Sequence, residues 1–284
     1  MRFVPLALIL LSACGSPLPP VPDAGLPGQP QCFVPSDGGV FTTGLSAPVP
    51  GCALAPQQTG VLDLTQLKWS RTGGVLVVPE STPGTALPVV FVFHGAYGSG
   101  EDAREQFALE AAADGGAIFV YPNAIQGTWD IGPFSGDGRR VETLLGNLSA
   151  NYCIDPARVY LAGYSAGAVF TLYLGCNVPG SFRGMASVAG SQTRFDNRCC
   201  TGSISALFIH GTMDDAFPIA QGQYTRDDLL RRDQCSSTAT SDSAHCQGYP
   251  CPVPWAVDYC EWNGGHVVPG WAGEEIWRFV DESG

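Results

Sequence analysis

The sequence predicts an α/β fold built on a mainly parallel central sheet. From residue 74 onward, short apolar runs alternate with longer segments in which apolar residues recur at helical spacing. Several runs, such as the VVFVF stretch at 89–93, are continuously apolar, which is typical of strands that helices cover on both faces of a sheet. Regular alternation of strand and helix favours parallel pairing, and ligands then lie beyond the carboxyl ends of the strands.

Each expected strand is a short apolar run. Along the chain these runs are 74–79, 88–94, 117–121, 159–163, 184–189, 206–210 and 256–262. Each expected helix is a longer segment with helical period, lying between or after those runs. These segments are 101–114, 139–152, 165–175, 224–233 and 274–281.

Composition excludes several classes of protein. The 284 residues are 45% hydrophobic, enough for a sizeable core, so the chain is not a disordered protein. The formal net charge is −12 and no run of Lys or Arg exists, so nucleic acid is not an expected partner. No apolar stretch reaches the roughly 18–20 residues that a membrane-spanning helix needs.

The N-terminus predicts export and a lipid anchor. Arg2, an apolar run at 3–11 and small residues before Cys14 describe a signal peptide over residues 1–13. Leu11-Ser12-Ala13-Cys14 resembles the bacterial lipobox, which implies a lipid on Cys14 and attachment to the cell envelope. Residues 14–39 are rich in proline and predict a linker, and 40–284 would form one catalytic domain, expected to be a monomer.

Cysteine use fits an exported protein. Of eleven cysteines, ten remain if Cys14 carries lipid, which allows five disulfides. A zinc site is the alternative, but the chain has no C-x2-C pair, so no metal is expected. Sequence proximity suggests the pairs Cys32–Cys52 and Cys153–Cys176. The four C-terminal cysteines, at 235, 246, 251 and 260, would staple a loop insertion.

A candidate nucleophile lies directly after the expected strand at 159–163. Gly163-Tyr164-Ser165-Ala166-Gly167 is a G-x-S-x-G motif between a strand and a helix. In that setting the sharp turn presents the Ser165 hydroxyl at the sheet edge, and the helix N-terminus faces developing negative charge. The alternative is an ordinary Gly/Ser turn.

The base and its carboxylate follow from chain order. In the α/β-hydrolase order Ser–Asp–His, the base comes after Ser165. His94 precedes the serine, His245 lies among clustered cysteines and His210 ends a strand, which leaves His266 in a glycine-flanked loop. Asp214 and Asp215 both lie between serine and histidine, and composition does not choose between them.

Two backbone amides and one aromatic residue complete the expected site. The turn His94-Gly95-Ala96 ends another apolar strand, so the Ala96 and Ala166 amides are candidate oxyanion donors, with a plain glycine turn as the alternative for Ala96. Trp129, near Phe134, would line an aromatic acyl pocket or else pack over the edge of the core.

These motifs together resemble the secreted feruloyl esterase and polyhydroxybutyrate depolymerase family of α/β-hydrolases. The matching stretches are 90–100 (VFVFHGAYGSG), 117–122 (AIFVYP), 152–167 (YCIDPARVYLAGYSAG), 210–218 (HGTMDDAFP) and 264–270 (GGHVVPG). The resemblance implies that the aspartate of H-G-T-x-D, here Asp214, is the catalytic acid and that His266 is the base. It also implies that Cys153 is disulfide-bonded.

The chain departs from the family pattern at two places. Ala168 stands where the family has a second glycine after the nucleophile, and Val267-Val268 replaces a tryptophan after the base. The second change would alter the leaving-group side of the pocket.

The sequence therefore predicts an exported serine carboxylesterase that needs no cofactor. Its expected substrates are feruloyl-type plant-wall esters or hydroxybutyrate oligomers. A serine peptidase of the same fold is one alternative, but 284 residues leave no room for the large extra domain of such peptidases. A non-catalytic surface-binding lipoprotein is the other, and the filled triad positions argue against it.

Overall fold

The computed structural model describes residues 32–35, 50–53, 58–81, 84–200, 202–241, 243–252 and 254–283. The expected signal peptide, Cys14 and the linker up to residue 31 lie outside the described residues. Within these ranges, no helix is long and apolar enough to cross a membrane.

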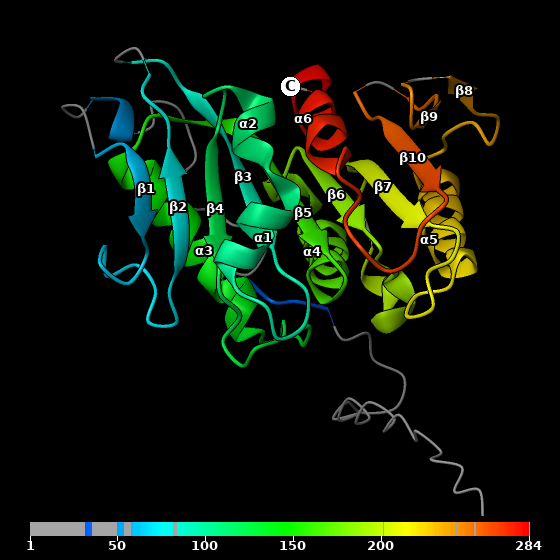
Figure 1. Ribbon diagram of the computed structural model, residues 1–284, viewed down its shortest axis with the longest axis horizontal. Coiled ribbons are helices and arrows are strands. Elements are labelled where there is room, and N and C mark those ends of the chain that lie inside the picture. Colours follow the sequence, from blue (N-terminus) through cyan, green and yellow to red (C-terminus); the bar gives the residue numbers. More distant parts are fainter. Residues whose placement is uncertain are drawn as a thin grey trace, which may run out of the picture.

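A single sheet, ten-stranded in the described part of the chain, runs through the molecule (Figure 1). Its order is β1-β2-β4-β3-β5-β6-β7-β10-β9-β8. The strands are β1 Gly60–Asp63, β2 Gly74–Val78, β3 Leu87–Phe93, β4 Ile118–Pro122, β5 Ile154–Tyr164, β6 Gly184–Val188, β7 Ser205–Gly211, β8 Thr240–Ser241, β9 Gln247–Tyr249 and β10 Val257–Trp262. All pairs from β4 to β10 are parallel, and the outer pairs are antiparallel. The predicted fold class is confirmed.

Helices cover both faces of this sheet (Figure 1). One face carries α1 Gly100–Phe107, α2 Leu109–Ala113 and α6 Ala272–Glu282, and the other carries α3 Gly136–Asn151, α4 Ala166–Asn177 and α5 Ile219–Arg232. Alternate residues of β3 belong to different cores: Phe91 faces α3 and α4, whereas Val90 and Val92 face α1 and α6. This two-sided burial explains the continuously apolar strands.

The expected helix over 101–114 is two helices. Ala108 has a left-handed backbone with φ 47°, so the chain turns there and restarts as α2. The break lets Phe107 and Leu109 both enter the core beside α6.

Residues 32–35, which the sequence assigns to the linker, belong to the folded domain. The Phe33 side chain is only 4% exposed and lies against Gly138 of α3 and the Tyr173 ring. The neighbouring Cys32 is bonded to Cys199. These contacts attach residues 32–35 to the domain, although they precede the predicted boundary at residue 40.

Five disulfides are present, as the cysteine count predicts, but two expected pairs are wrong. The bonds are Cys32–Cys199, Cys52–Cys153, Cys176–Cys200, Cys235–Cys251 and Cys246–Cys260. Cys32–Cys52 and Cys153–Cys176 do not form, because the fold brings cysteines far apart in sequence together. The four C-terminal cysteines do bond among themselves. Five disulfides indicate an oxidising compartment outside the cytoplasm.

Candidate active site

Strand register gathers the predicted site residues at one edge of the sheet. Phe93 of β3 pairs with Gly163 of β5, and Trp262 of β10 pairs with Gly211 of β7. Because these strands are parallel, their carboxyl ends and the loops that follow lie at the same edge. The loops after β3, β5, β7 and β10 carry the residues that the sequence singles out.

Ser165 occupies a sharp turn between β5 and α4. Its backbone has φ 55° and ψ −118°, a conformation that side-chain-bearing residues rarely adopt. Two glycines make the turn possible by letting backbone segments approach closely. A Cβ on Gly163 would lie 2.3 Å from the Gly167 carbonyl oxygen, and one on Gly167 would lie 2.2 Å from the Phe93 carbonyl oxygen. The small residues of the motif are therefore a packing requirement.

His266 joins Ser165 to Asp214. The His266 Nε2 lies 2.8 Å from Ser165 Oγ, and its Nδ1 lies 2.8 Å from Asp214 Oδ2. A carboxylate can only accept, so Nδ1 carries the proton and Nε2 is free to accept one from the serine hydroxyl. The structure thus brings together the three side chains proposed from the sequence, in the geometry of a nucleophile, a base and an orienting acid.

The local environment favours Asp214 over its neighbour. The Asp214 carboxylate is fully buried, and its Oδ1 accepts the backbone N–H groups of Ala216 at 3.0 Å and Phe217 at 2.8 Å. Asp215 is exposed and lies outside this arrangement. His210 shapes the turn, as expected for a histidine at a strand end, because its Nε2 donates to the Phe217 carbonyl at 2.7 Å.

Two aromatic rings pack against the His266 imidazole. Phe217 stacks on His266 with 5.6 Å between ring centroids and 21° between planes. The Tyr164 ring lies 5.2 Å from the imidazole, and the Tyr164 hydroxyl donates to the His266 carbonyl at 2.7 Å. The backbone and the ring of His266 are therefore both fixed.

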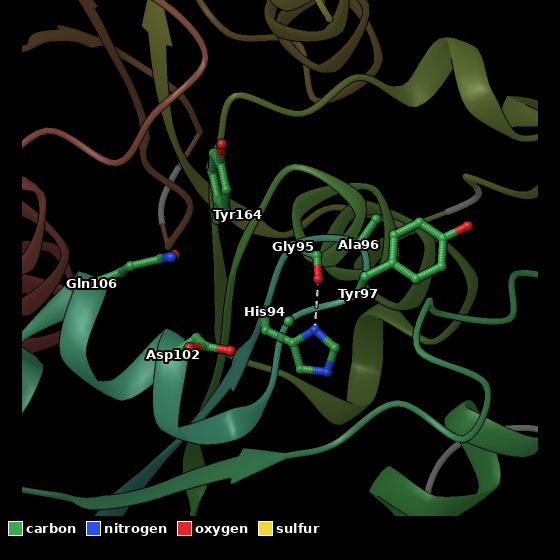
Figure 2. A pocket seen from close by; sticks show the side chains of 8 residues that line it. His94, Gly95, Ala96, Tyr97, Asp102, Gln106 and Tyr164 are labelled. Carbon is green, nitrogen blue, oxygen red and sulfur yellow. Dashed lines mark hydrogen bonds between the residues drawn. The ribbon is translucent and has the colours of Figure 1, made fainter. Parts of the chain in front are cut away.

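The turn after β3 borders a small cavity of about 180 Å³ (Figure 2). Its lining includes the candidate donor Ala96, the exposed ring of Tyr97 and the polar side chains of Asp102 and Gln106. Neither Ala96 nor Ala166 donates its backbone N–H to an acceptor in the described part of the chain. Both amides are thus available for a ligand.

His94 is a functional candidate that the sequence reasoning missed. It is buried; its Nδ1 donates to the Gly95 carbonyl at 2.6 Å, and its Nε2 accepts the Ala124 N–H at 3.0 Å (Figure 2 shows the first bond). In a trans peptide the N–H points away from the C=O, so this bond fixes the direction of the Ala96 N–H. Burial lowers the pKa of His94, which favours the neutral ring that both bonds require. The sequence signal that could have identified this role is the His94-Gly95 dipeptide at the end of β3.

Trp129 lies in the core, which agrees with the packed alternative for this residue. It is 6% exposed, stacks on Phe170 at 4.9 Å and donates Nε1–H to the His94 carbonyl at 2.8 Å. Its role in the structure is to hold the turn after β3. Phe134, in the same loop, is exposed.

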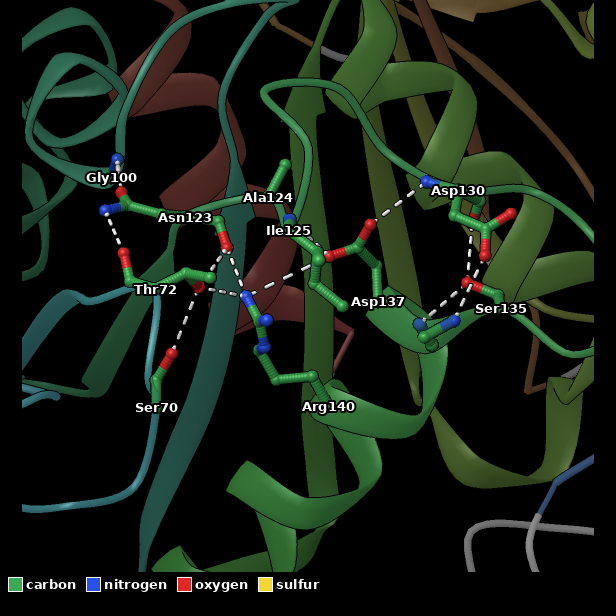
Figure 3. A network of polar contacts seen from close by, with 12 residues as sticks. Ser70, Thr72, Gly100, Asn123, Ala124, Ile125, Asp130, Ser135, Asp137 and Arg140 are labelled. Carbon is green, nitrogen blue, oxygen red and sulfur yellow. Dashed lines mark hydrogen bonds and ion pairs between the residues drawn. The ribbon is translucent and has the colours of Figure 1, made fainter. Parts of the chain in front are cut away.

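A buried polar network fixes the loop that carries Ala124 and Trp129 (Figure 3). Asp137 accepts the backbone N–H groups of Ile125 at 3.0 Å and Asp130 at 3.1 Å. Arg140 donates to the Asn123 carbonyl and lies 3.9 Å from the Asp137 carboxylate. Burial raises the pKa of Asp137, and the two backbone donors and the arginine oppose that rise. The loop that contacts His94 through Ala124 and Trp129 is therefore itself held by these hydrogen bonds.

Nothing among the described residues suggests a metal centre, since no group of three or more His, Cys, Asp and Glu side chains is arranged to hold an ion.

Comparisons with known proteins find esterases among the relatives of this chain. A family model described as phospholipase/carboxylesterase matches residues 135–249. Feruloyl esterase C of Emericella nidulans is 25% identical over 262 residues, covering 85% of this chain and 94% of that protein. Poly(3-hydroxyalkanoate) depolymerase C of Paucimonas lemoignei is 30% identical over 190 residues, covering 61% of this chain and 44% of that protein.

Among solved structures, an acetyl xylan esterase from Aspergillus awamori has the same fold. It superposes with a TM-score of 0.61 at 14% identity, over 78% of this chain and 99% of that one. The chain is thus similar to feruloyl esterases and to a poly(3-hydroxyalkanoate) depolymerase, it has the fold of α/β esterases, and it is a carboxylic ester hydrolase.

Proposed function

We propose that the protein is an exported serine esterase in which Ser165 is the nucleophile, His266 the general base and acid, and Asp214 the orienting carboxylate. The observation that carries this proposal is the continuous relay from Asp214 through His266 to Ser165, with 2.8 Å at both steps. A base atom that lies about 2.6–3.2 Å from the oxygen carrying the proton satisfies the geometric requirement for a general base.

The reaction would proceed through an acyl-enzyme. His266 Nε2 takes the Ser165 proton as Oγ attacks the ester carbonyl, and the resulting oxyanion is held by the Ala96 and Ala166 amides. The C–O bond to the alcohol then breaks, and the alcohol leaves with the proton from His266. Water, deprotonated by the same histidine, attacks the acyl group and restores Ser165. These steps use only groups of the chain.

The names of the relatives support a proposed substrate class. Their names point to feruloyl esters and to polyhydroxyalkanoates, so plant-wall feruloyl esters and hydroxybutyrate oligomers are the proposed substrates. Export agrees with the five disulfides. A lipid on Cys14 would anchor the enzyme to the cell envelope, with residues 14–31 as the spacer.

Hydrolysis of p-nitrophenyl acetate by the purified mature protein tests the proposal. We expect turnover by the wild type, no comparable cleavage of a peptide anilide, and loss of activity on Ser165→Ala with an unchanged melting temperature. Retention of more than about a hundredth of wild-type kcat by Ser165→Ala would exclude the serine as nucleophile. Preferential cleavage of the anilide would favour a peptidase, and no turnover of either would favour a binding protein.

A further inference from the structure

An arginine beside the candidate site is separated from the catalytic histidine by one aromatic ring. Arg194 ends a short 3-10 turn, Gln192–Arg194, that follows β6. Its guanidinium carbon lies 4.7 Å from the centroid of the Phe217 ring. That ring in turn stacks on the His266 imidazole. The Arg194 side chain is exposed, so its donors face solvent at the rim of the site.

No carboxylate among the described residues neutralises the charge of Arg194. In the described part of the chain, no carboxylate lies within ion-pair distance of Arg194. Asp196, two residues later, pairs with Arg198 instead. The net charge of the chain is −12, and many arginines do have carboxylate partners: 104, 140, 198, 226, 231, 232 and 278. Arg194 is one of five described arginines without a carboxylate partner, with 71, 139, 158 and 183, and its guanidinium is the one that lies over the ring that stacks on His266.

Neighbouring groups add to the positive potential. The turn is tied to the start of α5, because Thr193 Oγ1 donates to Gln221 Oε1 at 3.2 Å. The N-terminus of α5, a 14-residue helix, has no side-chain cap and carries the positive end of the helix dipole. Gln192 in the same turn is buried, and its Nε2 has no acceptor among the described residues. An anion bound at the Arg194 guanidinium would therefore lie near the positive end of the α5 dipole.

The position of Arg194 relative to His266 assigns the part of the substrate that it contacts. In the proposed mechanism, on which this inference rests, His266 hands its proton to the departing alcohol, so the alcohol lies on the histidine side of Ser165. Phe217 flanks that histidine, and Arg194 lies over Phe217. We propose that Arg194 binds a carboxylate on the alcohol portion of the substrate, so that the preferred substrates are esters of hydroxy acids. A guanidinium suits this role because its fork of N–H groups matches a carboxylate.

Two substrates that differ only in charge test the proposal. The first is 3-acetoxybutyrate, and the second is its primary amide, which has the same single ester bond and no negative charge. We expect the wild type to prefer the acid and Arg194→Gln to raise KM for the acid about ten-fold, with kcat unchanged, because the contact is distant from the reacting atoms. The amide should change by less than about two-fold, and the preference should weaken with salt.

Arg139→Gln is the matched control. Arg139 is also exposed and lies over an aromatic ring, with 6.0 Å from its guanidinium carbon to the Phe134 centroid. It lies in α3, the helix after β4, and β4 is three strands from β6, the strand that precedes Arg194, or about 14 Å at 4.8 Å per strand. Removing this charge should leave both substrates unaffected.

The outcomes separate this proposal from the proposed function. An acid-to-amide ratio that is the same in wild type and Arg194→Gln, in an enzyme that hydrolyses p-nitrophenyl acetate, would overturn the role of Arg194 and leave the serine mechanism standing. An equal effect of Arg139→Gln would show that only net charge matters and would also overturn it. Failure to hydrolyse p-nitrophenyl acetate would refute the proposed function, and the role of Arg194 with it.

Discussion

Replacing Asp214 by asparagine should reverse the tautomer of His266. The Asp214 Oδ1 accepts two backbone N–H groups, at 2.8 and 3.0 Å, whereas Oδ2 faces His266 Nδ1. An asparagine would keep its only oxygen toward the two N–H groups and place its NH2 against Nδ1. The imidazole would then carry its proton on Nε2 and could no longer accept one from Ser165.

The expected loss is large because the geometry stays intact while the base is disabled. At a comparable Asp–His–Ser site this change lowers kcat by about 10⁴. At 1.36 kcal/mol per tenfold, that equals about 5 kcal/mol of transition-state stabilisation. The measurement is kcat and kcat/KM on p-nitrophenyl acetate, with the melting temperature as a check that the variant folds.

Asp215→Asn is the matched control, because it makes the same chemical change at the neighbouring exposed position. We expect it to retain kcat within about two-fold, as surface substitutions away from the site usually have small effects. Equal losses in the two variants, or a greater loss in Asp215→Asn, would show that Asp214 does not orient His266.

Three further predictions concern the turn after β3, the disulfides and the anchor. Burial lowers the pKa of His94 in the native protein, so on acidification the unfolded chain binds a proton at this residue before the native protein does. The contribution of His94 to the free energy of unfolding should therefore be fully present above pH 6.5 and decrease as the pH falls below that value. The melting temperature of His94→Gln should therefore fall less on acidification than that of the wild type. Identical plots of melting temperature against pH for the two proteins would contradict this prediction. The oxidised, denatured domain lacking Cys14 should show no Ellman-reactive thiol, and two or more thiols would refute the five disulfides. Loss of any one disulfide should lower the free energy of unfolding by roughly 2–5 kcal/mol. Cys14→Ser should release the enzyme from membranes, or leave the precursor uncleaved, with esterase activity preserved; unchanged membrane fractionation would argue against a lipid at this cysteine.

Much of the sheet could be predicted from sequence, because two-sided burial leaves a strong local signal. All seven expected strands are present, each with boundaries within a few residues except β5, which begins five residues earlier. The three strands that were missed lie outside the parallel part of the sheet. β1 buries only Leu62, and β8 and β9 have two and three residues. Such short or half-exposed strands have no pattern that distinguishes them from loops.

The site residues could be predicted from sequence where one short motif contains both the reactive side chain and the turn that places it after a strand. Ser165 and His266 each lie in a short segment with a recognisable turn. Disulfide partners and the support of His94 were not predictable, because they depend on contacts between segments far apart in the chain. The bond from Ala124 to His94 joins residues 30 positions apart, and Cys32 meets Cys199 across 167 positions.

The position of Trp129 shows a further limit. An aromatic residue in a loop at the sheet edge fits an acyl pocket and a core contact equally well on sequence alone. The difference is set by His94, whose carbonyl accepts the indole N–H, and by Phe170, which stacks beneath the ring. Neither contact has a signature within the loop itself.

Covalent trapping of Ser165 is the most direct test of the central proposal. The mature enzyme is treated with a serine-directed phosphonate, and intact-protein mass spectrometry and peptide mapping locate the adduct while residual esterase activity is followed. We predict one adduct per chain, on Ser165, formed in step with the loss of activity and absent from Ser165→Ala and strongly slowed in Asp214→Asn. An adduct on another residue that accompanies inactivation, or full inhibition of the enzyme without modification of Ser165, would contradict the proposed mechanism.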